Sequence, residues 1–150
     1  MSTSSSRKRI LIIQGHPSPD SLSAALAQAW AEGAQSKGHS VRWLRLGGLQ
    51  FDPILHGSDP HQQTLEPDLL QAQQDLLWAE HTVWVFPVWW GGVPALLKGF
   101  LDRTFTSGFA FRFESGSPMP VPLLKGRTAE LLVPLDTPAW YYRWVQRRPA

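Results

Sequence analysis

The amino-acid sequence predicts a doubly wound α/β domain in which four parallel strands alternate with helices. Short runs rich in isoleucine, valine and leucine, typical of strands buried on both faces, alternate with segments whose apolar residues recur at helical spacing. Two of these runs end in a polar or aromatic loop that leads directly into a helix, and such loops lie side by side at the carboxyl edge of a parallel sheet. The 150 residues form a single domain, of which residues 1–8 are a polar tail.

The first half of the chain supplies two strands and one helix. Residues 9–14 form a continuous apolar run, as expected of a central strand, and residues 40–46 alternate apolar and polar side chains, as expected nearer an edge. Glycines and Asp-Pro pairs predict a long loop over residues 47–66. Between the strands, residues 21–37 form an amphipathic helix with an apolar face that comprises Leu22, Ala25, Leu26, Ala29, Trp30 and Gly33.

The second half repeats the alternation. Pro67 suits the first turn of a helix, residues 81–86 form the third strand, a third helix opens at Pro94, and residues 128–135 form the fourth strand. The remaining residues can supply a loop and a helical turn, whereas a sheet of order 2-1-3-4-5 also has a fifth strand and a closing helix. We therefore expect a sheet of order 2-1-3-4, from a fragment or a shortened family member, with an exposed apolar edge at the fourth strand.

Composition excludes several classes of function. The chain has no cysteine, which excludes disulfides and thiolate metal sites, and its five histidines lack the spacing and acidic context of a metal site. The apolar runs are too short to cross a bilayer and the N-terminus lacks the apolar segment of a secretory signal, so we expect a cytoplasmic protein. The pI near 9.3 comes from scattered arginines, without the basic stripe that a nucleic acid would require.

The loop after the first strand, GHPSPDSLSAAL, suits a phosphate. Ser18, Ser21 and Ser23 surround the start of a helix, whose free backbone N–H groups and positive dipole end attract an anion. His16 can add a hydrogen bond to such a group. The alternative is that Ser21 or Asp20 simply caps the helix.

The loop after the third strand suits a flat ring. It contains Pro87, Val88, Trp89, Trp90 and Gly91. Because adjacent side chains at a strand end diverge, at least one tryptophan borders a cleft or a partner chain. An aromatic wall with nearby backbone donors is what a flavin ring requires, so the two loops together indicate a flavin. The alternative, packing on the next helix or a dimer contact, applies to Trp89 more than to Trp90.

Three motifs carry a family resemblance: PVWWGGVPALLKGFLDRTFTSGFAF, GHPSPDSLSAAL and FDPIL. They resemble the ring-binding segment, the phosphate loop and the segment after strand two of the flavodoxin-like NAD(P)H:quinone oxidoreductase family. The resemblance implies a bound FMN or FAD, two-electron reduction of quinones or related small-molecule acceptors by NADH or NADPH, and homodimers with active sites at the subunit interface. It also implies that His16, Leu22 and Ser23 contact the flavin phosphates and that residues 87–91 hold the ring.

The loop after the fourth strand departs from the family pattern. Members best known for quinone reduction resemble Thr-Thr-Gly-Gly there, whereas this chain has Asp136, Thr137 and Pro138. Proline offers no backbone N–H, but the Thr137 hydroxyl could replace that donor toward the ring. Tyr142 or Trp140 could cover the substrate side, and the alternative is that these aromatic residues anchor a terminal helix.

Several functions share these features. A one-electron carrier of the same fold depends on an acidic surface, which a pI near 9.3 does not provide. An FMN reductase or azoreductase stays open as an alternative, as does a shortened module without turnover. The leading hypothesis is a two-electron NAD(P)H oxidoreductase with ping-pong kinetics, because donor and acceptor would use one face of one ring.

Overall fold

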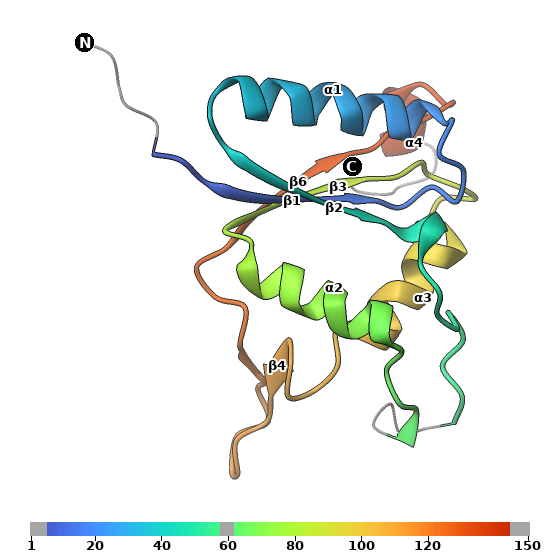
Figure 1. The fold of residues 1–150 in the computed structure, drawn as a ribbon. Helices are drawn as coiled ribbons and strands as arrows, with labels where there is room; N and C mark the ends of the chain where they lie inside the picture. Colours follow the sequence, from blue (N-terminus) through green and yellow to red (C-terminus); the bar gives the residue numbers. More distant parts are fainter. Residues whose placement is uncertain (1–5, 58–61, 145–150) are drawn as a thin grey trace.

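The main sheet contains four parallel strands. The computed structural model describes residues 6–57 and 62–144 of the chain. This main sheet has the order β2-β1-β3-β6, which confirms the predicted doubly wound architecture and strand order (Figure 1). Its members are β1 (Arg9–Gln14), β2 (Ser40–Arg45), β3 (His81–Val85) and β6 (Thr128–Leu132).

Helices cover both faces of the sheet. α1 (Leu22–Ser36) lies along one face, and α2 (Pro67–Trp78) and α3 (Ala95–Thr104) lie against the other (Figure 1). Pro67 occupies the first turn of α2, where its missing N–H costs no hydrogen bond. Both ends of α1 lie within one residue of the predicted helix 21–37, and α2 and α3 begin within one residue of the predicted starts.

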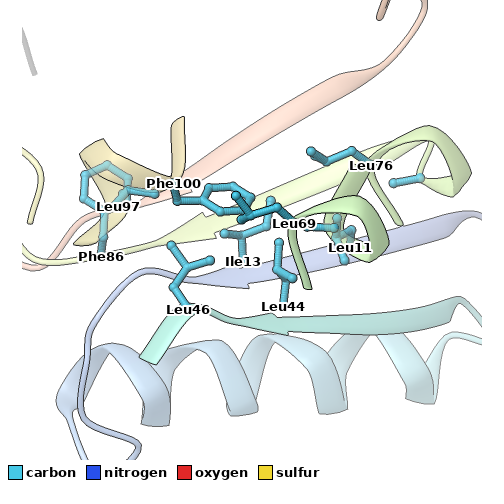
Figure 2. Close-up of a cluster of buried hydrophobic side chains, with 11 residues drawn as sticks. Leu11, Ile13, Leu44, Leu46, Leu69, Leu76, Phe86, Leu97 and Phe100 are labelled. Carbon is cyan, nitrogen blue, oxygen red and sulfur yellow. The ribbon is translucent and has the colours of Figure 1, made fainter. Parts of the chain in front are cut away.

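Alternate residues of β1 supply two separate cores. Leu11 and Ile13 belong to the larger cluster on the α2 and α3 side, and Ile10 and Ile12 belong to the smaller cluster under α1. Each of these four side chains is at most 3% exposed, as expected of a central strand, and contributes about 1.5–3 kcal/mol by its burial. Figure 2 shows the larger cluster, which also contains Leu44, Leu46, Leu69, Leu76, Phe86, Leu97 and Phe100.

The face that α1 buries differs from the predicted one. Leu22 and Leu26 were expected to face the sheet but are 66% and 38% exposed. The buried residues are instead Ser23, Ala27, Ala31 and Ala34, which recur every three or four positions. These small side chains let the helix axis lie close to the sheet, and the two leucines fall on the neighbouring flank. The prediction of the apolar face of this helix was therefore wrong.

Several short elements carry no clear sequence signal. A 3₁₀ turn, η1 (Leu46–Gly48), follows β2, and a two-stranded ribbon of β4 (Phe111–Arg112) and β5 (Val121–Pro122) follows α3. A helical turn was expected near the end of the chain, and α4 (Ala139–Trp144) occupies that position. None of the helices in the described part of the chain is long and apolar enough to cross a membrane.

The fourth parallel strand is an edge within the described residues. β6 ends at Leu132, three residues before the predicted end, and Pro134 follows closely. β6 pairs with β3 in parallel, from His81 opposite Thr128 to Val85 opposite Leu132. Leu131 is 62% exposed, in line with the expected apolar surface at this strand.

Candidate functional site

A cleft lies at the carboxyl edge of the sheet, where β1, β3 and β6 end. It has a volume of about 130 Å³ and brings together three loops that are far apart in the sequence. Eight of the twelve residues predicted to bind a cofactor line it. The lining residues are His16, Ser21, Leu22, Ser23, Pro87, Val88, Trp89, Pro134 and Asp136.

Backbone hydrogen bonds beyond the strand ends hold these loops together. The Gly15 N–H donates to the Val85 carbonyl at 2.8 Å, which joins the loop after β1 to the loop after β3. The Val88 N–H donates to the Pro134 carbonyl at 3.3 Å, which joins the loop after β3 to the loop after β6. The cleft therefore follows from the parallel pairing of neighbouring strands, whose carboxyl ends share one edge.

Two polar side chains of the first loop are engaged in local structure. The Ser21 hydroxyl accepts a hydrogen bond from the Ala24 N–H at 3.2 Å and donates to the Ser18 carbonyl at 3.1 Å. Ser21 is thus the N-cap of α1, which was the alternative interpretation of this serine. The Ser18 hydroxyl accepts from the Asp20 N–H at 3.2 Å, and Ser18 does not line the cleft.

His16 keeps one ring nitrogen available. Its Nδ1 accepts a hydrogen bond from the Ser18 N–H at 2.9 Å, so a neutral imidazole carries its proton on Nε2. The ring also meets the edge of the Trp89 indole, with centroids 5.2 Å apart. His16 can therefore offer an Nε2–H donor while its ring orientation is fixed by two contacts.

Ser23 adds a further polar side chain to the cleft. The residue is 2% exposed, yet among the described residues its hydroxyl has no hydrogen-bond partner. It lies in the first turn of α1, which contains no acidic side chain that would oppose an anion. Within the described residues, the fully buried side-chain oxygen without a partner is Thr104 Oγ1 of α3; the Ser23 hydroxyl is instead open to the cleft, and so it is suited to a ligand there.

The two tryptophans diverge at a tight turn. Trp89 and Gly92 exchange backbone hydrogen bonds of 2.9 and 3.0 Å, and the central residues Trp90 and Gly91 have φ of 52° and 74°. Trp89 lines the cleft, whereas Trp90 is fully exposed and lies outside it, as does Gly91. The divergence was predicted, but a position of Trp90 in the wall of the cleft is not what the structure shows.

Replacing Trp90 with asparagine should stabilise the fold. Two central residues with positive φ are typical of type I′ turns, which favour Asn-Gly, and a bulky residue in this region costs about 1–2 kcal/mol. We expect Trp90→Asn to raise the free energy of unfolding by about 1 kcal/mol in chemical denaturation. The control is Trp140→Asn, which removes another exposed tryptophan (63% exposed) and should not stabilise. A destabilised Trp90→Asn protein would show that this side chain has a contact to lose.

The loop after β6 contributes one acidic side chain. Asp136 lines the cleft, but Thr137, whose hydroxyl was expected to face the ring, does not. Trp140, expected on the substrate side, is 63% exposed and contacts the Tyr141 ring at 5.7 Å, away from the lining residues. The side chain of Tyr142 lies outside the described part of the chain, so its predicted role stays a prediction.

A buried arginine, which sequence reasoning missed, supports the loop between η1 and α2. Arg103 of α3 is 1% exposed and donates to the carbonyls of Asp52 and Thr64 at 2.6 and 2.9 Å. It also forms an ion pair with Glu66 at 2.9 Å. Burial raises the pKa of Glu66, but the N–H groups of Asp52 and Glu66 and the Arg103 guanidinium lower it more, so it lies below its ordinary value.

The position of Arg103 in the helical pattern of the sequence indicates that this side chain is buried. Arg103 follows Gly99 and Phe100 by one helical turn, and all three belong to the buried side of α3. A cation on the apolar side of a helix requires partners, and the acidic Asp52 and Glu66 flank the loop that packs there. The FDPIL and LKGFLDR motifs therefore form one structural unit.

Comparison with known proteins identifies the family. NAD(P)H dehydrogenase (quinone) 1 of Cavia porcellus is 32% identical over 126 residues, which cover 71% of this chain and 46% of the relative. The crystal structure of Smu.1420 from Streptococcus mutans UA159 is 31% identical with a TM-score of 0.77, and the match covers 92% of this chain and 73% of that one.

More distant structures share the fold alone. An FMN-dependent NADH-azoreductase from Bacillus anthracis str. Ames Ancestor, solved in complex with FMN, is 18% identical with a TM-score of 0.66, over 93% of this chain and 74% of that one. The match spans between 45% and 66% of the length of eight curated relatives. The family model of the flavodoxin-like fold matches residues 8–148. This chain therefore belongs to the family of proteins with the flavodoxin-like fold.

Proposed function

We propose that this chain binds a flavin, FMN or FAD, in the cleft and acts in the NAD(P)H-dependent two-electron reduction of quinones or similar acceptors. One observation carries the proposal. The loops that the sequence assigned to a phosphate and to a flat ring border the same cleft, and the Ser23 hydroxyl on α1, which has no hydrogen-bond partner among the described residues, belongs to a residue that lines it. The name of the guinea-pig relative, a quinone dehydrogenase that uses NAD(P)H, supports the reaction class.

The phosphate end of the cleft fits an anion. The first turn of α1 offers backbone N–H groups at its positive dipole end and has no acidic residue. The Ser23 hydroxyl and the His16 Nε2–H add two side-chain donors in the same cleft. These groups would hold the flavin phosphate, while the engaged Ser21 hydroxyl keeps the helix start in place.

The other end of the cleft fits an aromatic ring. Pro87, Val88 and the Trp89 indole supply an apolar wall, and Asp136 and Pro134 bound the cleft from the loop after β6. A flavin bound there would accept hydride from NADH or NADPH and transfer it to an acceptor. The role of the protein is to orient the flavin ring and to exclude water from it.

Oligomeric state and location form part of the proposal. The family resemblance implies a homodimer with active sites at the subunit interface, and we propose that state for this chain. The cytoplasm is the location that we propose, because a chain without cysteine gains no disulfides from an oxidising compartment.

Steady-state kinetics test the proposed reaction. Protein loaded with FMN or FAD should show flavin absorbance and oxidise NADH or NADPH faster when a quinone is added. Initial velocities at several quinone concentrations should give parallel double-reciprocal lines, because both substrates use one face of the ring. Intersecting lines would contradict the ping-pong mechanism. Faster turnover of an azo dye than of any quinone would favour the azoreductase alternative, and protein that takes up no flavin would overturn the proposal.

A further inference from the structure

The backbone of the phosphate loop is in close contact with the 3₁₀ turn η1. At Gly47, in the middle of η1, an added Cβ atom would overlap the Pro17 carbonyl oxygen and lie only 2.8 Å from the Pro17 carbonyl carbon. Distances below about 3.0 Å do not occur for real Cβ atoms, so one of the two backbones would have to move. Only glycine permits this approach.

The turn is fixed more firmly than the loop that it contacts. Leu46, which opens η1, is fully buried in the larger core (Figure 2). On the other side of η1, the Gln50 N–H donates to Asp68 at 2.7 Å and the Asp52 carbonyl accepts from the buried Arg103 at 2.6 Å. A methyl group at position 47 would therefore displace Pro17 rather than η1.

Displacement of Pro17 would act on the donors of the cleft. Pro17 stands between His16 and Ser18, which are joined by the hydrogen bond from the Ser18 N–H to His16 Nδ1. The Ser18 carbonyl in turn accepts from the Ser21 hydroxyl, which caps α1. A shift of Pro17 thus changes the orientation of the His16 ring and the position of the loop at the start of α1.

We propose that Gly47 is a positioning residue for the phosphate loop, and that this contact sets how tightly the chain holds the phosphate of its flavin. The inference rests on the proposed function. It assigns a role in ligand binding to a residue that does not line the cleft. Gly47 acts on the flavin phosphate through Pro17 and does not touch the flavin itself.

The test compares two flavins that differ only in the phosphate. The affinities of the full chain for FMN and for riboflavin are measured by fluorescence titration. The ratio of the two affinities measures how much the phosphate group contributes to binding. In Gly47→Ala this ratio should fall about tenfold or more, the loss expected when one charged hydrogen bond is broken. Riboflavin affinity should change by less than about twofold, because the ring wall is elsewhere.

Gly48→Ala is the matched control. It adds the same methyl group to the next residue of the same turn, where an added Cβ meets nothing within 4 Å. This variant should keep the FMN-to-riboflavin ratio of the wild type. If Gly47→Ala kept the wild-type ratio, or if Gly48→Ala lost as much, the positioning role of Gly47 would be overturned.

Two further measurements separate the other outcomes. If the wild-type chain binds FMN no better than riboflavin, the proposed phosphate site fails, whatever the variants do. If Gly47→Ala does not fold, the ratio is measured in the double variant with Pro17→Gly, whose freer backbone can move away from the methyl. If the double variant has the same FMN-to-riboflavin ratio as the single Pro17→Gly variant, the inference is overturned. If the ratio of the double variant is lower, the inference is supported.

Discussion

Replacing Ser23 with aspartate should abolish flavin binding. The residue is 2% exposed and lines the cleft at the first turn of α1, where the proposed phosphate would lie. A carboxylate there would fill this space and repel the phosphate, so FMN affinity should fall about a hundredfold or more, or ~3 kcal/mol. Fluorescence titration with FMN measures the change. An affinity like that of the wild type would place the anion site elsewhere.

Two variants control this experiment. Ser36→Asp adds the same charge at the far end of α1, where the serine hydroxyl is exposed, and should leave FMN affinity within about twofold. Ser23→Ala removes only the hydroxyl. Because that hydroxyl has no partner in the described chain, we expect the free energy of unfolding without ligand to change by less than about 0.5 kcal/mol. FMN affinity should still fall about tenfold, the share of one donor to a charged group.

Replacing Arg103 with methionine should destabilise the fold strongly. The guanidinium is 1% exposed and serves two carbonyl groups as well as the Glu66 carboxylate. Its removal takes the donor from the two carbonyl groups and the counterion from the Glu66 carboxylate, which costs about 3–5 kcal/mol and lowers the melting temperature by roughly 6–20 °C for a chain of this size. Thermal melting monitored by circular dichroism measures the shift.

An exposed ion pair on the same helix supplies the control. Lys98 contacts Asp102 at 2.6 Å but its side chain is 61% exposed, so Lys98→Met should cost less than about 1 kcal/mol. The two variants should also differ in pH dependence. The pKa of Glu66 is lowered in the fold, so its stabilising effect is present above the unfolded value of 4.5 and is lost as the pH falls. The difference between wild type and Arg103→Met should therefore shrink in acid. Equal melting shifts for the two variants would contradict the buried role of Arg103.

The strand order and the meeting of the loops were predictable from the sequence. Runs such as residues 9–14 are apolar throughout, and parallel strands joined by helices leave few possible arrangements. Once the order was fixed, the loops after β1 and β3 had to share one edge. Residues from both loops, Ser23 and Trp89 among them, accordingly line the same cleft.

The details that failed depend on contacts that no local pattern records. Leu26 and Ala27 are both apolar, and only the fit of α1 on the sheet decides that the alanine is the buried one. Trp90 was predicted to border the flavin ring because it lies within residues 87–91. The turn that it shares with Gly91 directs its side chain into solvent. The approach of Gly47 to Pro17 joins segments from different loops, which the sequence alone does not bring together.

The central position of β1 has a consequence for synthesis. β1 and the phosphate loop are synthesised before β3, so one edge of β1 has no partner until β3 follows, and Arg103 appears 51 residues after its partner Asp52. A nascent chain that ends before β3 therefore presents an unpaired apolar strand and has no cleft. We expect such a nascent chain to be prone to aggregation, and a ligand cannot stabilise it because some of the residues that would hold the ligand have not yet been synthesised.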